Sequence, residues 1–196
     1  MPPSTRITRE MIVDAALEVV RRSGAENVNA RSVAQTLGCS TQPVMYQFAT
    51  IEELKRAAYA GLDRMHTEYL FRIPPGGDPL PEIGMNYIRF AVEEPNWFRF
   101  LFQSGYAAGN SLSQMLDAQE LEPILRAMGG ETDLPEERTK DVFMITAMFI
   151  HGCACLIANN ALEYDEAAVA RQLERAFVGA VMAVKKEENN HESHPA

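Results

Sequence analysis

Apolar residues recur every three or four positions along most of the chain, and this spacing predicts helices rather than strands. The first helix is expected between Thr8, a capping residue, and Gly24. Its apolar stripe consists of Ile12, Ala15, Ala16, Val19 and Val20. A second, short helix follows Asn29 and ends at Gly38, and a third begins at Ser40. The N-terminal part of the chain therefore predicts three helices around a small core.

The remainder of the chain predicts about six further helices. The fourth opens at Thr50 with the capping-box pattern Thr-Ile-Glu-Glu and continues to about residue 72. No helix can traverse the Pro- and Gly-rich segment 74–81. Beyond it, helices are expected over 82–94, 95–104, 111–128 (with Pro123 disturbing it), 136–161 and 165–186, and a disordered polar tail over 187–196. The predicted fold class is all-α, with about nine helices.

Residues 30–48 meet the steric requirements of a helix-turn-helix. Ala34 is small where two helices would cross, and Gly38 can adopt the positive φ of a tight turn. A shared core is expected from Val33, Leu37, Cys39, Val44 and Phe48. The side chains left to point outward are Thr41, Gln42, Met45, Tyr46 and Gln47. Gln can pair bidentately with adenine, Thr and Met can contact a thymine methyl, and Tyr can reach a phosphate. An ordinary helical hairpin without a ligand would show the same spacing.

The charge of the chain is unevenly distributed. The 196 residues carry a formal net charge of -9, yet residues 1–60 hold seven Lys or Arg against six Asp or Glu. A near-neutral segment on an acidic body can bind DNA only if its few cations face the phosphates. Three cysteines imply no disulfide framework, the N-terminus lacks a secretory signal, and no run of about 18 residues is continuously apolar. A cytoplasmic protein without a membrane span is expected.

Residues 8–62 resemble the tetracycline-repressor-like (TetR/AcrR) family of bacterial transcription regulators. The resemblance depends on a helix ending in Gly, a Gly-x-Ser turn, an aromatic-x-Phe ending of the recognition helix and a following Glu-Glu-Leu. The positions that match are Gly38, Ser40, Tyr46, Phe48, Glu52, Glu53 and Leu54. The opening Ser-Thr-Gln-Pro of the recognition helix is similar to one branch of the family. The sequence departs from the family at Met45 and Gln47, where Tyr and His are frequent, and at Ile51, where Lys often faces a phosphate.

The resemblance implies a homodimer that binds a pseudo-palindromic operator, with recognition helices in successive major grooves. Residues 1–50 would form the DNA-binding domain, 51–72 a connecting helix, and 51–186 an effector-binding and dimerisation domain. The residues assigned to DNA are Arg6, Arg9, Asn29, Arg31, Ser40, Thr41, Gln42, Pro43, Met45, Tyr46, Gln47 and Lys55. At Ile51 a phosphate contact is either missing or supplied by Lys55 and Arg56.

The C-terminal part contains two long apolar stripes and many aromatic and Met residues. The stripes, which the resemblance assigns to an isologous four-helix dimer interface, contain Phe143, Ala147, Ile150, Ala154, Ile157, Val169, Leu173, Ala176, Phe177, Ala180, Val181 and Val184. A small hydrophobic effector is expected to contact Met85, Tyr87, Phe90, Trp97, Phe98, Phe102, Met115, Met144, Met148 and His151. Packing in the domain's own core would account for the same residues, so both interpretations stay open.

No cofactor, metal or catalytic site is expected. His151 and Cys155 are one helical turn apart, but two potential ligands do not form a metal site, and no orienting acid accompanies them. The favoured function is a ligand-responsive repressor with operator DNA, a second copy and a small effector as partners. The alternative is a helical ligand- or protein-binding module whose helix-turn-helix does not read DNA, which the scarcity of cations over 40–48 permits.

Overall fold

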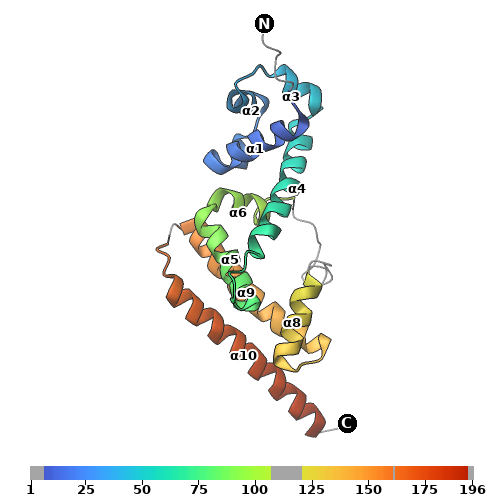
Figure 1. The fold of residues 1–196 in the computed structure, drawn as a ribbon, viewed down its shortest axis with the longest axis vertical. Helices are drawn as coiled ribbons and strands as arrows, with labels where there is room; N and C mark the ends of the chain where they lie inside the picture. The colour runs from blue at the N-terminus through green and yellow to red at the C-terminus, as the bar shows by residue number, and fades with distance from the viewer. Residues whose placement is uncertain (1–6, 107–120, 161, 194–196) are drawn as a thin grey trace. The chain divides into compact units, whose positions relative to one another are not determined.

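The computed structural model describes residues 7–106, 121–160 and 162–193. Their elements are α1 (Arg9–Ser23), the 3-10 turn η1 (Ala25–Asn27), α2 (Ala30–Leu37), α3 (Gln42–Gln47), α4 (Ile51–Leu70), α5 (Pro79–Glu93), α6 (Pro95–Phe102), α8 (Glu122–Thr132), α9 (Glu136–Asn160) and α10 (Glu166–Ser193) (Figure 1). Within these residues every regular element is helical, which confirms the all-α prediction.

The chain divides into two compact units that do not follow the predicted boundary at residue 50. The first contains the described residues of Met1–Tyr69 and Glu93–Ala107, and the second those of Leu70–Val92 and Ala108–Ala196. The division differs because α6 packs on α1. Trp97 Nε1–H donates to the carbonyl of Leu17 (2.8 Å), and Asn96 Nδ2–H donates to that of Arg21 (2.8 Å). These bonds attach α6 to the N-terminal helices.

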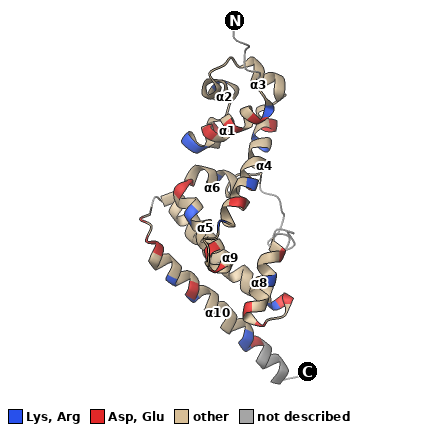
Figure 2. Ribbon diagram, in the orientation of Figure 1, with Lys and Arg blue, Asp and Glu red and all other residues tan. Residues whose placement is uncertain are grey.

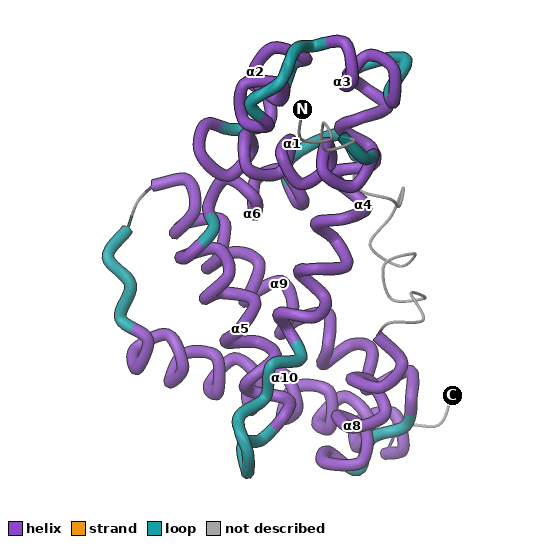
Figure 3. Tube along the Cα trace, turned by 45° about the horizontal axis from the view of Figure 1, so that its top comes forward, coloured by secondary structure: helices purple, strands orange, loops and turns teal. Residues whose placement is uncertain are grey.

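The first unit has a continuous apolar core. Its largest fully buried side chains are Ile12, Val20, Val33, Val44, Phe48, Leu54, Leu62, Phe98, Phe100 and Leu101. The predicted stripe of α1 lies in this core, because Ile12, Ala15, Ala16, Val19 and Val20 are all buried. Burial of each such aliphatic or aromatic side chain stabilises the folded state by about 1.5–3 kcal/mol relative to exposure. The core therefore fixes α1, α4 and α6 as the platform under the two short helices α2 and α3 (Figure 3).

The second unit is built on a helical hairpin. α10 returns along α9, and α8 packs against α9 (Figure 1). Buried residues of this unit are Met128, Leu134, Val142, Ala180 and Val184, with Leu80, Phe143, Phe177 and Val181 packed against them. Arg89 on α5 forms ion pairs with Glu82 on the same helix and with Glu166 at the start of α10. The guanidinium therefore connects α5 to the first turn of α10.

Several predicted boundaries are wrong. Pro79 and Pro81 lie in the first turn of α5, where a helix has free amides and tolerates proline, so the 74–81 break ends earlier than expected. Pro123 begins α8 rather than interrupting a helix over 111–128, whose residues up to 120 lie outside the described part. Gly129, which lies between the helices predicted over 111–128 and 136–161, belongs to α8, where an added Cβ would stand 3.2 Å from Thr139 Oγ1. α10 continues to Ser193, past the expected start of a disordered tail.

α9 is long and apolar enough to cross a membrane by length and composition alone. Its most apolar 18-residue window has a mean hydropathy of 1.9, and 22% of that window is buried within the protein. The core helix of a soluble protein can pass the same test, so this feature is weak evidence for a span. α9 contributes Val142, Ala154 and Ala158 to the core of its own unit. α9 is therefore a core helix, and many of its other apolar side chains are exposed.

Gly38 provides a local test of the turn between α2 and α3. Its φ of 65° lies in the left-handed region, and an added Cβ would meet nothing within 4 Å. We expect Gly38→Ala to lower the free energy of unfolding by about 1–2 kcal/mol through backbone strain alone. The matched control is Gly61→Ala, inside α4, which should raise it by about 0.5–1 kcal/mol. Urea unfolding followed by the fluorescence of Trp97, the single tryptophan, reports on this unit; equal effects of the two substitutions would contradict the assignment.

His66 makes the stability of the first unit depend on pH. The ring is buried on α4, edge-on to Phe102 with ring centroids 5.2 Å apart, and burial lowers the pKa of His66 from 6.5 to about 4. Between these pH values the unfolded chain binds a proton that the folded chain does not, so stability falls as pH falls through this window. By pH 4 the loss approaches about 3 kcal/mol, since each pKa unit corresponds to about 1.4 kcal/mol.

The measurement is urea unfolding by Trp97 fluorescence at pH 7 and at pH 4. His66→Gln removes the titrating group, so the variant should lose less stability than the wild type over this interval. Parallel losses in the two proteins would show that carboxylates, not His66, cause the acid sensitivity.

Candidate functional site: the α2–α3 surface and the C-terminal cavity

The turn between α2 and α3 forms as the sequence predicted. Asn29 caps α2 by accepting from the amides of Arg31 and Ser32 (both 3.0 Å), and the Ser32 hydroxyl accepts from the amide of Asn29 in return (3.1 Å). Gly38 ends α2 in the left-handed conformation. The side chain of Asn29, assigned to DNA from the sequence, is thus engaged in this capping box and positions α2.

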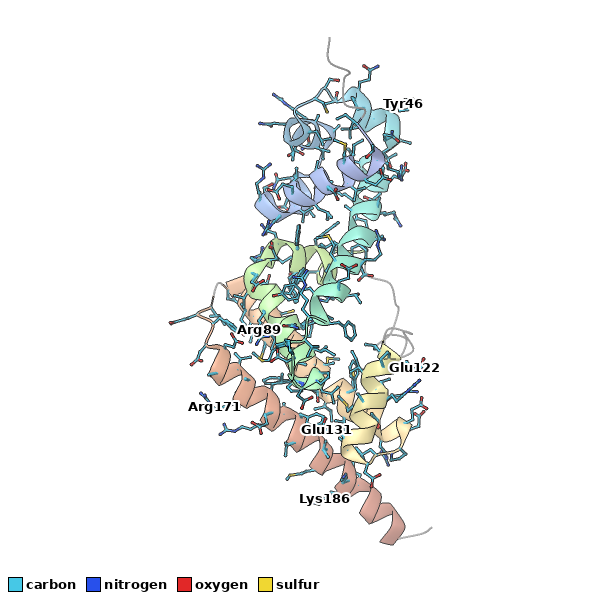
Figure 4. The ribbon with its side chains drawn as sticks, in the orientation of Figure 1. Tyr46, Arg89, Glu122, Glu131, Arg171 and Lys186 are labelled. Atoms are coloured by element: carbon cyan, nitrogen blue, oxygen red, sulfur yellow. The ribbon has the colours of Figure 1, made fainter. Side chains whose placement is uncertain are left out.

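α3 has one buried face and one exposed face. Val44 and Phe48 are fully buried beneath it, as predicted, while Leu37 and Cys39 are only half-buried. Ser40, Thr41, Gln42, Met45 and Tyr46 are exposed, and Pro43 and Gln47 are half-buried. Tyr46 has 85% of its surface exposed and projects from the unit in Figure 4. The outward set predicted from the sequence therefore lies on one accessible face.

The exposed side chains of α3 have no partner inside the described chain. No hydrogen bond or ion pair involves the side chains of Thr41, Gln42 or Tyr46 within the described residues. α3 also carries no charge, and its ribbon is uniformly tan in Figure 2. The face therefore presents hydroxyl and amide groups that are free to bond to an external molecule.

Arg9, assigned to DNA from the sequence, is engaged within the protein. Its guanidinium lies 3.9 Å from the centroid of the Phe48 ring, donates to the carbonyl of Gln47 (2.7 Å) and pairs with Glu53 (3.0 Å). The Glu53 carboxylate also accepts from the amide of Ala49 (3.1 Å). The hydrogen bond from Arg9, and after it the one from Ala49, lowers the pKa of Glu53. Arg9 thus joins the start of α1 to the end of α3 and the start of α4.

The remaining cations assigned to DNA differ in their availability. Arg31 is exposed and Lys55 half-buried, and neither side chain has a partner among the residues that the structure describes. Arg56 pairs with Glu52 across one helical turn (3.6 Å). Arg6 lies outside the described residues. Among the described residues, Arg31 and Lys55 are therefore the assigned cations that remain available to phosphates.

The residues assigned to the effector are not brought together. Trp97, Phe98 and Phe102 belong to the first unit, where Phe98 is fully buried and the Trp97 indole is bonded to Leu17. Met85, Tyr87, Phe90, Met144, Met148 and His151 belong to the second unit, and Met115 lies outside the described residues. They are thus divided between two cores rather than lining one pocket.

His151 takes part in a hydrogen-bonded group inside the second unit. Tyr87 Oη is 2.9 Å from His151 Nδ1, and Cys155 Sγ is 3.3 Å from His151 Nε2. Burial lowers the pKa of His151. No group of three His, Cys, Asp or Glu side chains suited to a metal occurs among the described residues.

A cavity of about 480 Å³ opens in the second unit, and the sequence interpretation missed it. Its walls come from Asp78, Leu80, Pro81, Met85, Met128, Glu131, Thr146, Ile150, Ala170, Arg171, Leu173, Glu174, Phe177 and Val178. Met85 is the one residue of the predicted effector set among them. Ile150, Leu173 and Phe177 were assigned to the dimer interface instead. The sequence shows the apolar spacing of α9 and α10, but it does not show which neighbouring element each helix face contacts.

The predicted dimer stripe lies largely inside the chain. Ala154, Leu173, Ala180 and Val184 are buried, and Phe143, Ala147, Ile157, Val169, Ala176 and Val181 are half-buried. A second copy cannot contact the four buried residues, which pack in the core of their own unit. The large apolar side chains exposed on the hairpin are instead Ile145, Met148, Leu156, Val178 and Met182.

Several known proteins are similar to this chain. A nicotine-responsive transcriptional repressor of the helix-turn-helix type, HdnoR of Paenarthrobacter nicotinovorans, is 31% identical over 80 residues, which span 41% of this chain and 41% of the relative. The fold of a tetR-family transcriptional regulator from Streptomyces coelicolor is similar with a TM-score of 0.70, at 18% identity, over 94% of this chain and 85% of that one.

Two further matches concern the C-terminal half and ligand binding. The multidrug binding protein EbrR, complexed with ethidium, has a similar fold with a TM-score of 0.52, at 18% identity, over 90% of this chain and 98% of that one. The family model for the tetracycline-repressor-like C-terminal domain matches residues 80–179, which is half of the chain. The chain therefore belongs to the tetracycline-repressor-like family, whose members are transcription regulators and not enzymes.

Proposed function

We propose that the protein is a dimeric, ligand-responsive transcription repressor that binds a pseudo-palindromic operator through α3 and is released by a small hydrophobic molecule. The observation that carries the DNA-binding part is the exposed face of α3, whose Thr41, Gln42 and Tyr46 side chains have no partner among the described residues. A major groove admits a helix of this kind and offers hydrogen-bonding base edges to such groups. Nicotine response and ethidium binding in the two relatives support the ligand-responsive part.

Arg31 and Lys55 supply the phosphate contacts in this proposal. A protein that neutralises a phosphate releases counterions, so each contact steepens the fall of affinity with salt. With few available cations, we expect a shallow salt dependence and a large share of affinity from base contacts. Arg9 acts indirectly, because it holds the end of α3 in place.

The test uses gel shifts on the DNA upstream of the protein's own gene. We expect Gln42→Ala to weaken binding about 5- to 150-fold for each half-site, as the loss of a good base contact costs about 1–3 kcal/mol, and Tyr46→Ala to weaken binding through a lost phosphate contact. Arg31→Gln should weaken binding to all sequences and reduce the salt slope by about 1.8, since one phosphate contact is lost in each of the two half-sites. The control is Gln172→Ala, an exposed glutamine on α10. Unchanged affinity in both α3 variants would disprove the role of this face, and absence of any shift would favour a module that does not read DNA.

The dimer part of the proposal depends on the exposed apolar face of the hairpin. Ile145, Met148 and Leu156 form one exposed stripe of α9, and Met182 is exposed on α10, whereas Val178, one turn earlier, lines the cavity. Contiguous exposed apolar patches often mark interaction sites. A second copy that packs its own hairpin against this face would bury the α9 stripe and Met182 in a four-helix arrangement.

Sedimentation velocity tests the assignment of this face. Leu156 is 56% exposed, so Leu156→Glu should leave the fold intact while it places two carboxylates inside the proposed interface. We expect the variant to be monomeric at concentrations where the wild type is dimeric. Leu162→Glu, at a leucine that is 50% exposed but follows the end of α9, is the matched control and should remain dimeric. A dimeric Leu156→Glu protein would place the interface elsewhere.

A further inference from the structure

The cavity of the second unit has an apolar interior. Its volume of about 480 Å³ falls in the range of about 300–1,000 Å³ that small-molecule sites occupy. Met85 and Met128 contribute polarizable thioethers and Phe177 an aromatic ring. The hydroxyl of Thr146 donates to the carbonyl of Val142 (2.9 Å), so its proton is already used. The interior therefore favours an apolar ligand and does not require the ligand to carry hydrogen-bonding groups.

The charges of the cavity lie on exposed side chains, and their balance is negative. Three carboxylates, of Asp78, Glu131 and Glu174, stand against the single guanidinium of Arg171. Glu131 comes from α8 and Arg171 from α10 (Figure 4). Within the described residues the side chains of Glu131, Glu174 and Arg171 form no ion pair or hydrogen bond. Asp78 Oδ1 accepts from the amide of Leu80 (3.2 Å).

Pairing is frequent among other carboxylates of the same unit. Glu82 and Glu166 are paired with Arg89, and Glu136 and Glu137 with Lys140. Two unpaired carboxylates beside one apolar cavity therefore leave a local excess of negative charge. An anion would meet Arg171 but also the three carboxylates, whereas a cation gains from the net charge.

We propose that this cavity binds an apolar organic cation, with the apolar body against Met85, Met128 and Phe177 and the charge toward Glu131 and Glu174. One part of this inference rests on the proposed function, namely that the bound cation is the effector that changes the affinity for the operator. Binding itself requires no DNA, so the two can fail separately. Since the carboxylates are exposed, most of the affinity comes from apolar burial and the charges supply selectivity.

Two probes of matched size and shape separate the contribution of charge. Tetraphenylphosphonium is a cation and tetraphenylborate an anion of the same architecture. Isothermal titration of the full chain without DNA should show tetraphenylphosphonium binding at least tenfold more tightly at low salt, with the difference shrinking as salt screens the exposed carboxylates. Equal affinities, or tighter binding of tetraphenylborate, would overturn the proposal.

Charge variants at the cavity identify the groups responsible. The double variant Glu131→Gln/Glu174→Gln should weaken tetraphenylphosphonium about 3- to 10-fold and strengthen tetraphenylborate. Arg171→Gln should act in the opposite direction on both. Glu163→Gln, at an exposed carboxylate that does not line the cavity, controls for the overall negative charge of the protein. A loss in Glu163→Gln as large as in the double variant would assign the selectivity to the general field and reject the cavity carboxylates.

A steric pair of variants locates the site. Ala170 lines the cavity, whereas Ala167, one turn earlier on α10, is exposed and does not. Ala170→Phe should abolish tetraphenylphosphonium binding, and Ala167→Phe should leave it unchanged, with helicity by circular dichroism confirming that both fold. Equal binding in both variants would place the ligand elsewhere. If the wild type binds its operator but binds no tetraphenylphosphonium, this inference is rejected and the DNA-binding proposal stands.

Discussion

The orientation of α3 depends on the guanidinium of Arg9. A six-residue helix is too short to be stable alone, and α3 is anchored from below by the burial of Val44 and Phe48. Arg9 covers the Phe48 ring, binds the carbonyl of Gln47 and pairs with Glu53. The carbonyl of Gln47 belongs to the last turn of α3, where carbonyls have no N–H donor within the helix. A cation is favourable at this end of a helix. One side chain of α1 thereby fixes both the end of α3 and the start of α4.

This use of Arg9 changes the electrostatics of the proposed DNA surface. The sequence offered few cations near α3, and the structure engages one of the strongest candidates internally. Arg31 and Lys55 are the assigned cations left without an internal partner among the described residues, on a chain of net charge -9. Uncharged groups on α3 must then contribute a larger share of the affinity than in a strongly basic domain. Such a balance favours discrimination between sequences over tight non-specific binding, because phosphate contacts carry no sequence information.

Features fixed by near neighbours in the chain could be predicted from the sequence. The caps at Thr8 and Asn29, the left-handed Gly38 and the two faces of α3 depend on residues within a few positions, and the structure has them as expected. The boundary between the units could not be predicted in this way. It depends on Trp97 reaching Leu17 and Glu94 reaching Arg21, contacts between residues more than 70 positions apart. No local pattern indicates that α6 will pack on α1.

The same limit explains why the sequence did not show which residues of α9 and α10 are buried, which line the cavity and which are exposed. α9 is apolar on nearly all sides, so periodicity shows that it has partners but not which face each partner covers. In the structure Val142, Ala154 and Ala158 face the core, Thr146 and Ile150 line the cavity, and Ile145, Met148 and Leu156 are exposed. The exposed stripe and the cavity wall alternate along one rigid helix, with Ile145 next to Thr146 and Met148 two residues before Ile150. The proposed ligand site and the proposed dimer face therefore share α9, and only the order of residues along that helix decides which side chain serves which surface.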